Sequence, residues 1–169
     1  LEGRWLTYFN PSNERLERLL RREYKNAYLS VNKFLNYKEH NKSYSHENRL
    51  LEKWALIDID GQSFPSKEHE ETYFQLLKEK VIQEDILIDQ IVKTNNTLGG
   101  HQMLFSPDNA LRLKEIIHEP LFDLIDRRVF DERRVRRLGE TWNGNKNSMA
   151  ITIFPESKCL YIRNPQEGS

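Results

Sequence analysis

The sequence predicts an α+β fold in which helices flank a mostly antiparallel sheet. Short apolar runs rich in β-branched residues alternate with segments of helical periodicity. Turn residues separate neighbouring strand candidates closely enough for hairpins. The length of 169 residues is usual for one domain with one core. Residues 1–169 are therefore expected to form a single domain.

The first half of the chain alternates helix, strand and loop candidates. Residues 12–24 carry leucines at helical spacing behind Ser12, a favourable cap residue. Residues 27–31 form a short strand candidate, and the polar stretch 38–48 predicts a surface loop. Residues 54–60 are the clearest strand candidate.

The middle of the chain predicts a helix, a hairpin and a second helix. Residues 66–83 begin with several glutamates, which suit a helix N-terminus. Residues 86–94 and 101–105 form two strand candidates around a turn of Asn, Thr, Leu and Gly. Ser106-Pro107 opens the next helix, which should end before Pro120.

The last part of the chain predicts strands and a basic run. Residues 121–130 form a shorter strand candidate, and residues 133–137 carry four arginines. Residues 150–154 and 159–163 are expected to pair as a final hairpin across a turn that contains proline.

Composition limits the classes of function. Lysine and arginine total 26, as do aspartate and glutamate, so the net charge is zero. This counts against a histone-like DNA coat but leaves a local basic groove open. The single cysteine, Cys159, permits no internal disulfide and no cysteine-pair zinc site. No apolar run reaches the ~20 residues of a membrane span, so no membrane association and a cytoplasmic setting are expected. The start at Leu1 favours a piece of a longer protein.

Asp58 and Asp60 are the strongest candidates for chemistry. Side chains alternate along a strand, so both carboxylates share one face, roughly 7 Å apart. Such a pair can bind Mg²⁺ or Mn²⁺ together with substrate phosphates. A solvated strand face is the alternative interpretation. The apolar neighbours Leu56, Ile57 and Ile59 favour a buried central strand, where an acid needs a partner or a metal.

Three further motifs extend this candidate site. Gly99-Gly100-His101 could cradle a phosphate, although a plain hairpin turn with a half-buried histidine fits equally. Asp126 follows apolar residues and could supply a third carboxylate, with a salt bridge to Arg127 or Arg128 as the alternative. Within the basic run, Arg133, Arg134 and Arg136 are candidate nucleic-acid contacts, and a solvated face is the alternative.

The order of these motifs resembles the archaeo-eukaryotic primase superfamily, the primase-polymerases. Ile57-Asp58-Ile59-Asp60 is similar to the first motif of that family, and Thr97-Leu98-Gly99-Gly100-His101 to the second. Ile125-Asp126 is similar to the third, and Arg137-Leu138-Gly139-Glu140-Thr141 through Lys146 to the turn that follows it. Tyr28-Leu29-Ser30 resembles the segment before the first motif. The resemblance covers residues 24–147.

Three features depart from the family pattern. The proline of the third-motif turn is absent and Gly139 is displaced. Thr97 or Asn96 stands where the second motif usually has serine. The zinc-binding element that is frequent in the family is missing.

The resemblance implies a catalytic core related to the RNA-recognition fold, with an antiparallel sheet, flanking helices and an adjoining N-terminal α/β unit. It implies that Asp58, Asp60 and Asp126 hold two Mg²⁺ or Mn²⁺ ions. Residues implied to contact the nucleotide or the template phosphate are Thr97, Gly99, Gly100, His101, Arg137 and Lys146.

The implied activity is template-directed synthesis of phosphodiester bonds from nucleoside triphosphates, with release of pyrophosphate. The implied partners are the triphosphates, a single-stranded DNA template with its primer, and further domains or subunits.

Two other functions stay open at this point. A non-catalytic nucleic-acid-binding module, such as an accessory primase subunit, would present stacking aromatic side chains instead of an acidic centre. A metal-dependent nuclease would also use acids and a lysine, but no acid-x-lysine pair follows Asp60 closely.

Overall fold

The computed structural model describes residues 13–20, 26–34, 50–94, 96 and 99–155. The fold is α+β with antiparallel sheets, as the sequence predicts. Its main sheet has the spatial order β4 (Ala55–Ile59), β6 (His101–Phe105), β5 (Gln90–Thr94), β9 (Ser148–Phe154) and β8 (Thr141–Asn143). Every neighbouring pair in this sheet is antiparallel.

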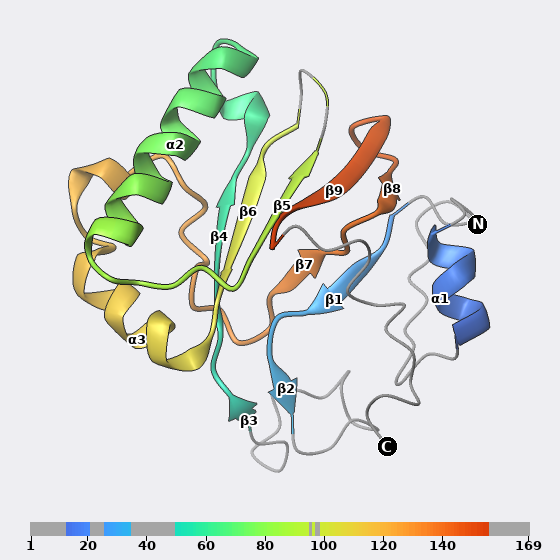
Figure 1. Cartoon of the computed structure of the whole chain (residues 1–169), viewed down its shortest axis with the longest axis horizontal. Coiled ribbons are helices and arrows are strands. Elements are labelled where there is room, and N and C mark those ends of the chain that lie inside the picture. Colours follow the sequence, from blue (N-terminus) through green and yellow to red (C-terminus); the bar gives the residue numbers. More distant parts are fainter. Residues whose placement is uncertain (1–12, 21–25, 35–49, 95, 97–98, 156–169) are drawn as a thin grey trace.

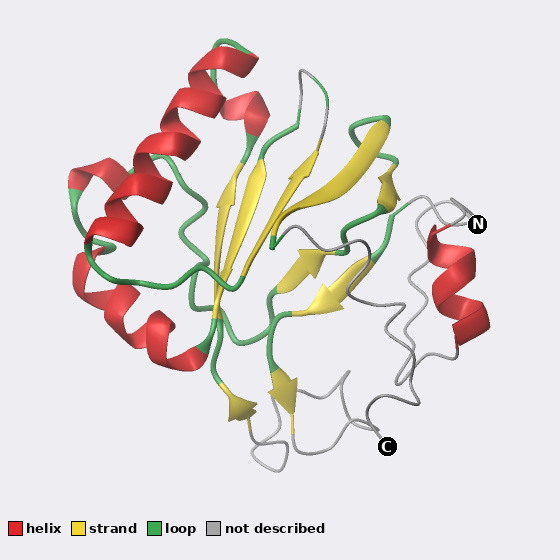
Figure 2. Ribbon diagram, viewed as in Figure 1, coloured by secondary structure: helices red, strands yellow, loops and turns green. Residues whose placement is uncertain are grey.

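Within the described residues, two small antiparallel pairs and three α-helices accompany the main sheet (Figures 1 and 2). The pairs are β1 (Tyr28–Ser30) with β7 (Val135–Arg137), and β2 (Lys33–Phe34) with β3 (Leu50–Glu52). The helices are α1 (Asn13–Leu20), α2 (Lys67–Gln83) and α3 (Pro107–Ile116). Two 3-10 turns, η2 (Gly61–Ser63) and η3 (Pro120–Phe122), follow β4 and α3.

The main core lies between one face of the sheet and the helices α2 and α3, which Figure 1 shows on the same side. Alternation along β4 points Ile57 and Ile59 into this core. From α2, Phe74 and Leu77 pack against them at helical spacing. The opposite face carries a smaller apolar cluster around Leu56. Asp58 therefore emerges on the face away from α2 and α3.

Several local predictions are confirmed. The predicted strand at 101–105 matches β6, and the predicted strand at 54–60 contains β4. The Ser66 side chain accepts a hydrogen bond from the His69 amide at 3.3 Å and caps α2. α3 begins at Pro107. The predicted cap at Ser12 and the loop at 38–48 lie outside the described residues.

The predicted strand at 121–130 is wrong. Pro120 begins the turn η3, and the rest of the segment up to residue 130 is irregular. Its buried apolar residues, Phe122, Ile125 and Val129, are three and four positions apart, whereas a strand with one buried face would alternate. These apolar residues are buried, but their spacing along the chain does not fit a strand.

The C-terminal strand β9 contains the predicted strand at 150–154. β9 forms its hairpin with the preceding strand β8, and β9 also pairs with β5. Residues 159–163, the predicted partner, lie outside the described residues. The strand predicted at 86–94 begins only at Gln90, because the amide of Ile86 bonds to the carbonyl of Val81 and closes the end of α2.

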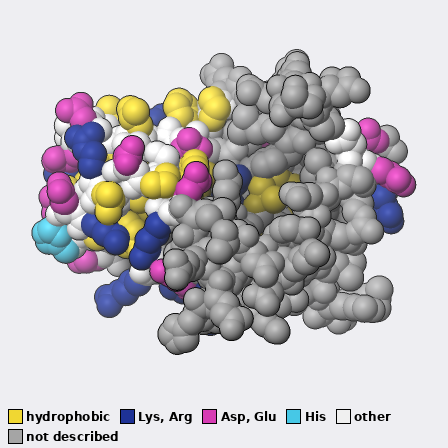
Figure 3. All heavy atoms as spheres, turned by 90° about the horizontal axis from the view of Figure 1, so that it is seen from below, with side chains coloured by type: hydrophobic (Ala, Val, Ile, Leu, Met, Phe, Trp, Pro, Cys, Tyr) yellow, Lys and Arg dark blue, Asp and Glu magenta, His cyan; other side chains and the backbone are white. Residues whose placement is uncertain are grey.

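Two properties of the exterior bear on partners. In the described part of the chain, no helix combines the length and the apolar character that a membrane crossing requires. On the face seen in Figure 3, acidic and basic side chains are interspersed with apolar ones over the described residues. This mixture agrees with the zero net charge of the chain.

Candidate functional site

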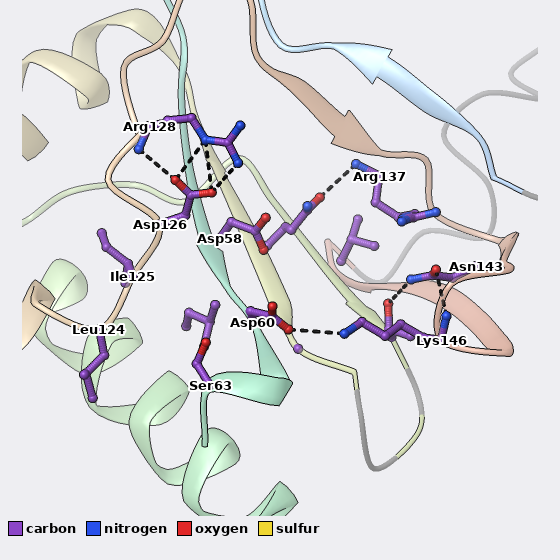
Figure 4. A pocket seen from close by; sticks show the side chains of 15 residues that line it. Asp58, Asp60, Ser63, Leu124, Ile125, Asp126, Arg128, Arg137, Asn143 and Lys146 are labelled. Atoms are coloured by element: carbon purple, nitrogen blue, oxygen red, sulfur yellow. Dashed lines mark hydrogen bonds and ion pairs between the residues drawn. The ribbon is translucent and has the colours of Figure 1, made fainter. Parts of the chain in front are cut away.

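A pocket of about 430 Å³ opens beside the end of β4, on the sheet face away from α2 and α3. Its wall includes the three predicted aspartates Asp58, Asp60 and Asp126 (Figure 4). Arg137 and Lys146 line the same pocket. With Gly100, which also lines it, the pocket brings together six predicted site residues that are spread over 89 positions of the sequence, from 58 to 146.

Asp126 reaches the pocket from an irregular segment that lies against β4. The backbone amide of Asp126 donates to the carbonyl of Asp58 at 3.1 Å. Two residues earlier in β4, the amide of Leu56 donates to the carbonyl of Val129 at 3.0 Å. These two bonds fix the segment along β4 without a regular strand. They account for the position of Asp126 beside Asp58.

A buried arginine bridges two of the aspartates. The Arg134 side chain is 6% exposed, and its terminal nitrogens lie 3.5 Å from Asp58 Oδ2 and 3.4 Å from Asp126 Oδ1. The carbonyl of Arg134 accepts from the Val31 amide at 2.9 Å, which anchors this segment just before β7. Arg134 was predicted to contact nucleic acid. The structure places its guanidinium between the carboxylates.

The other carboxylate contacts also involve cations. Lys146 Nζ lies 3.2 Å from Asp60 Oδ1. Arg128 binds Asp126 through its side chain, at 2.6 Å between Nη2 and Oδ2, as the alternative interpretation of Asp126 proposed. Each of the three aspartates is therefore neutralised by at least one basic side chain in this state.

The protein environment shifts the acidities of two aspartates in opposite directions. Burial of the charged carboxylate is the main reason why the pKa of Asp58 is raised. Arg134 and Gln102 oppose this shift, and Asp126 and Asp60 add to it. About a third of the Asp58 side chain, 34%, still contacts solvent. The pKa of Asp126 is lowered well below its ordinary value, chiefly by its hydrogen bonds from Arg128. Burial therefore disfavours the charged form of Asp58, whereas Arg128 favours the charged form of Asp126.

The raised pKa of Asp58 predicts that Asp58→Asn stabilises the metal-free protein at neutral pH. Between the ordinary pKa of 3.8 and the higher folded value, the folded state binds more protons than the unfolded state. Stability attributable to Asp58 therefore falls as pH rises through that window. Asparagine removes the penalty. Urea unfolding in EDTA should show Asp58→Asn more stable than the wild type at pH 7. The difference should shrink toward pH 3.5, and equal stability at both pH values would contradict the explanation.

Arg137 is held in a fixed orientation at the pocket wall. Its guanidinium donates to Asn26 Oδ1 at 2.7 Å and to the Tyr28 hydroxyl at 2.9 Å. The guanidinium carbon also lies 4.3 Å from the centre of the Tyr28 ring. The backbone amide of Arg137 donates to the side chain of Gln102 at 2.8 Å. Burial lowers the pKa of Arg137, and Tyr28 opposes the shift.

Close backbone packing explains why glycine stands at both Gly99 and Gly100 of the second motif. A Cβ on Gly100 would lie 1.8 Å from the carbonyl oxygen of Ile59, and one on Gly99 would lie 2.1 Å from that of Thr94. No other residue type fits such close backbone packing. Gly100 nevertheless lines the pocket. Its small size brings the start of β6 against the end of β4.

Gly100→Ala is therefore expected to destabilise the fold by about 1–3 kcal/mol, the usual cost of overpacking. The cause is the overlap with the Ile59 carbonyl, a backbone atom that cannot rotate away. Chemical denaturation would measure the loss. Ser63→Ala, at an exposed residue that lines the same pocket, serves as the control with little expected effect. A Gly100→Ala variant as stable as this control would refute the packing argument.

The structure does not bring His101 into the pocket. Its side chain is 1% exposed and lies on the sheet face that α2 covers. The ring stacks on Phe74 at 3.8 Å and bonds to Glu70. In the antiparallel register, Asp58 pairs with Gln102, and His101 pairs with Ile59. Gln102 rather than His101 therefore shares the face of Asp58.

The remaining predicted contacts are dispersed. Arg133 is exposed, and Arg136 lies in β7 with a side-chain hydrogen bond to Gln90 at 2.5 Å. Neither lines the pocket. Gly99 is displaced from it as well, and its carbonyl accepts from Lys67 at 3.2 Å. Thr97 lies outside the described residues.

Sequence reasoning missed several polar residues of the pocket, among them Gln102 and Asn143. Gln102 hydrogen-bonds Asp58 and Arg137. Alternation along its strand could have placed it on the same face as Asp58, but only with the register between β6 and β4 known. Asn143 lines the pocket from β8 and donates to the Thr94 hydroxyl at 3.1 Å. Its strand was not predicted, so no sequence signal placed it there.

The donor set of the pocket is chemically suited to a hard divalent cation, because carboxylate oxygens are the ligands that Mg²⁺ and Mn²⁺ prefer. The aspartate oxygens are not gathered tightly in this state. Among the described residues, a closely spaced set of possible metal ligands is formed by Glu70, Glu71 and His101. One ligand atom from each lies within 4.8 Å of the other two. That group lies on the other side of the sheet.

Comparison of the chain with models of protein families, with curated proteins and with solved structures finds no match.

Proposed function

We propose that this chain is a primase-polymerase core that joins nucleotides on a single-stranded DNA template. The observation that carries the proposal is the composition of one pocket: Asp58, Asp60 and Asp126 line it together, opposite Arg137 and Lys146. Polymerisation of nucleotides needs both groups. The acids suit metal ions, and the bases suit a triphosphate.

The three aspartates would hold two Mg²⁺ or Mn²⁺ ions, which supply activation of the attacking oxygen and stabilisation of the leaving group. In the reaction, the 3′ oxygen of the primer attacks the α-phosphorus of the nucleoside triphosphate. The bond from that phosphorus to the β-phosphate oxygen breaks, and pyrophosphate leaves. The primer hydroxyl loses its proton to water in this step.

The basic side chains would bind and orient the triphosphate. Arg137 is already held by Asn26 and Tyr28, so little side-chain freedom is lost when it contacts a phosphate. Lys146 Nζ now contacts Asp60 and would exchange this carboxylate for a phosphate oxygen once a metal ion binds the acid. Gln102 ties the position of Asp58 to that of Arg137, because it contacts both residues.

Contacts with the template would be local. The net charge is zero, and the face in Figure 3 carries charges of both signs. Neither observation points to a broad basic surface that would bind the template. Arg133 and Arg136 flank the buried Arg134 close to the pocket. They are the proposed contacts to the template or primer phosphates.

Crystals soaked with Mn²⁺ and a non-hydrolysable nucleoside triphosphate would test the proposal. We expect anomalous peaks for manganese at Asp58, Asp60 and Asp126, with the triphosphate against Arg137 and Lys146. The double variant Asp58→Asn with Asp60→Asn is the control and should show no manganese in the pocket. Bound nucleotide without an ion at Asp58 would favour a non-catalytic binding module. Cleavage of DNA without nucleotides would favour a nuclease.

A further inference from the structure

Glu70, Glu71 and His101 form a second polar cluster, separated from the aspartate pocket by the sheet. Glu70 and Glu71 belong to the first turns of α2, and His101 is the first residue of β6. Glu70 is fully buried and His101 is 1% exposed, whereas Glu71 is 32% exposed and forms the solvent side of the cluster. The proposed polymerase function does not use these three side chains.

The histidine has one ring nitrogen bound and the other without a hydrogen bond. His101 Nδ1 lies 2.5 Å from Glu70 Oε1. His101 Nε2 is fully buried and has no hydrogen-bond partner in the described part of the chain, and the same is true of Glu70 Oε2. The ring cannot turn to seek another partner, because Phe74 stacks on it with an interplanar angle of 7°. Unpaired buried polar atoms cost free energy unless a ligand satisfies them.

Glu71 faces the unpaired nitrogen. Its Oε2 lies 3.7 Å from His101 Nε2, which is too long for a hydrogen bond. Two ligand atoms of a tetrahedral zinc ion, each about 2.1 Å from the metal, lie roughly 3.4 Å apart. The other oxygen of Glu71 is already bound by Lys93 at 2.6 Å, so the carboxylate is held while Oε2 stays available.

We propose that Glu70, Glu71 and His101 bind a transition-metal ion of the Zn²⁺ class. His101 Nε2 and Glu71 Oε2 would be ligands. Glu70 would fix the ring through Nδ1, an arrangement in which a carboxylate orients a metal-binding histidine. The imidazole decides the class of ion, since imidazole suits Zn²⁺ whereas Mg²⁺ prefers oxygen ligands alone. One ligand atom from each of the three residues lies within 4.8 Å of the other two.

Two nearby lysines offer an alternative to a metal ion as the balance for the glutamate charges. Lys67 Nζ lies 3.8 Å from oxygens of both glutamates, and Lys93 also contacts Glu71. These ammonium groups already balance the two carboxylates. In the competing interpretation, the His101 ring lies between Glu70 and Glu71 without a metal ion. The two interpretations differ in a measurable way, because only the first binds zinc at one equivalent per chain.

The test uses the full chain with Asp58→Asn and Asp60→Asn, so that the aspartate pocket does not contribute. Isothermal titration with Zn²⁺ should give one site per chain that millimolar Mg²⁺ does not displace. Adding Glu71→Gln should weaken this site at least about tenfold, as losing a partner at a metal centre does. Adding Glu68→Gln, at an exposed residue of the same turn, should leave it unchanged.

Nitrogen NMR of the imidazole gives a second readout that needs no further variant. Zinc should shift the Nε2 resonance of His101 and leave Nδ1 bonded to Glu70. Absence of one-equivalent binding, or an Nε2 resonance unmoved by zinc, would overturn the proposal. Because the aspartate pocket is disabled in these proteins, neither result depends on the polymerase assignment.

Discussion

Asp58→Asn is expected to abolish metal-dependent nucleotide incorporation while the chain stays folded. The substitution keeps the shape of the side chain but removes the negative charge that a divalent ion needs. We expect the incorporation rate to fall at least about 100-fold, the scale on which one lost electrostatic group affects an active site. Primer extension with Mn²⁺ would measure it.

The same variant provides a strong internal check. It should be more stable than the wild type in EDTA, because the raised pKa of Asp58 marks a charge that the fold accommodates poorly. Asp108→Asn, in the exposed first turn of α3, is the matched control and should keep full activity. If Asp58→Asn incorporated nucleotides at the wild-type rate, Asp58 would not take part in catalysis, whatever the stability of the variant.

Arg134→Met, at the buried arginine beside the pocket, is expected to destabilise the fold. It leaves two neighbouring carboxylates without the cation that bridges them. Breaking a fully buried ion pair costs about 3–5 kcal/mol, and the partial exposure of both aspartates reduces this to roughly 2 kcal/mol. Urea unfolding in EDTA would measure the loss.

Divalent ions should reverse this effect in part. Without Arg134, the carboxylates of Asp58 and Asp126 attract a metal ion more strongly, so Mn²⁺ should raise the stability of Arg134→Met by more than that of the wild type. Arg133→Met is the matched control, since that side chain is exposed beside Arg134. If Mn²⁺ stabilises the three proteins equally, Arg134 does not occupy the position that the metal would take.

The sequence predicted best where local pattern and burial agree. β4 and β6 were found almost residue by residue, because their apolar residues form short runs bounded by Gly61 and Ser106. The pair Asp58 and Asp60 followed directly from alternation along β4. The three aspartates were chosen correctly as neighbours in space, although Asp126 reaches the pocket from an irregular segment rather than from a strand.

What the sequence could not provide is the register between segments far apart in the chain. His101 and Gln102 are consecutive, and only the pairing of β6 with β4 decides that Gln102 shares the face of Asp58. Arg134 looked like its exposed neighbours in the basic run. Its burial depends on the contacts of residues 131–134 with the N-terminal strand segment, which no local pattern encodes.

Incorporation of labelled nucleotides on a single-stranded DNA template would measure polymerase activity at this pocket directly. Reactions with ribo- or deoxyribonucleoside triphosphates, with and without a primer, would contain Mg²⁺ or Mn²⁺. The proposed function predicts products complementary to the template and one pyrophosphate released per nucleotide, with EDTA and Asp60→Ala both abolishing synthesis. Products that persist in Asp60→Ala, or no product with either ion and either class of nucleotide, would contradict a polymerase site at this pocket.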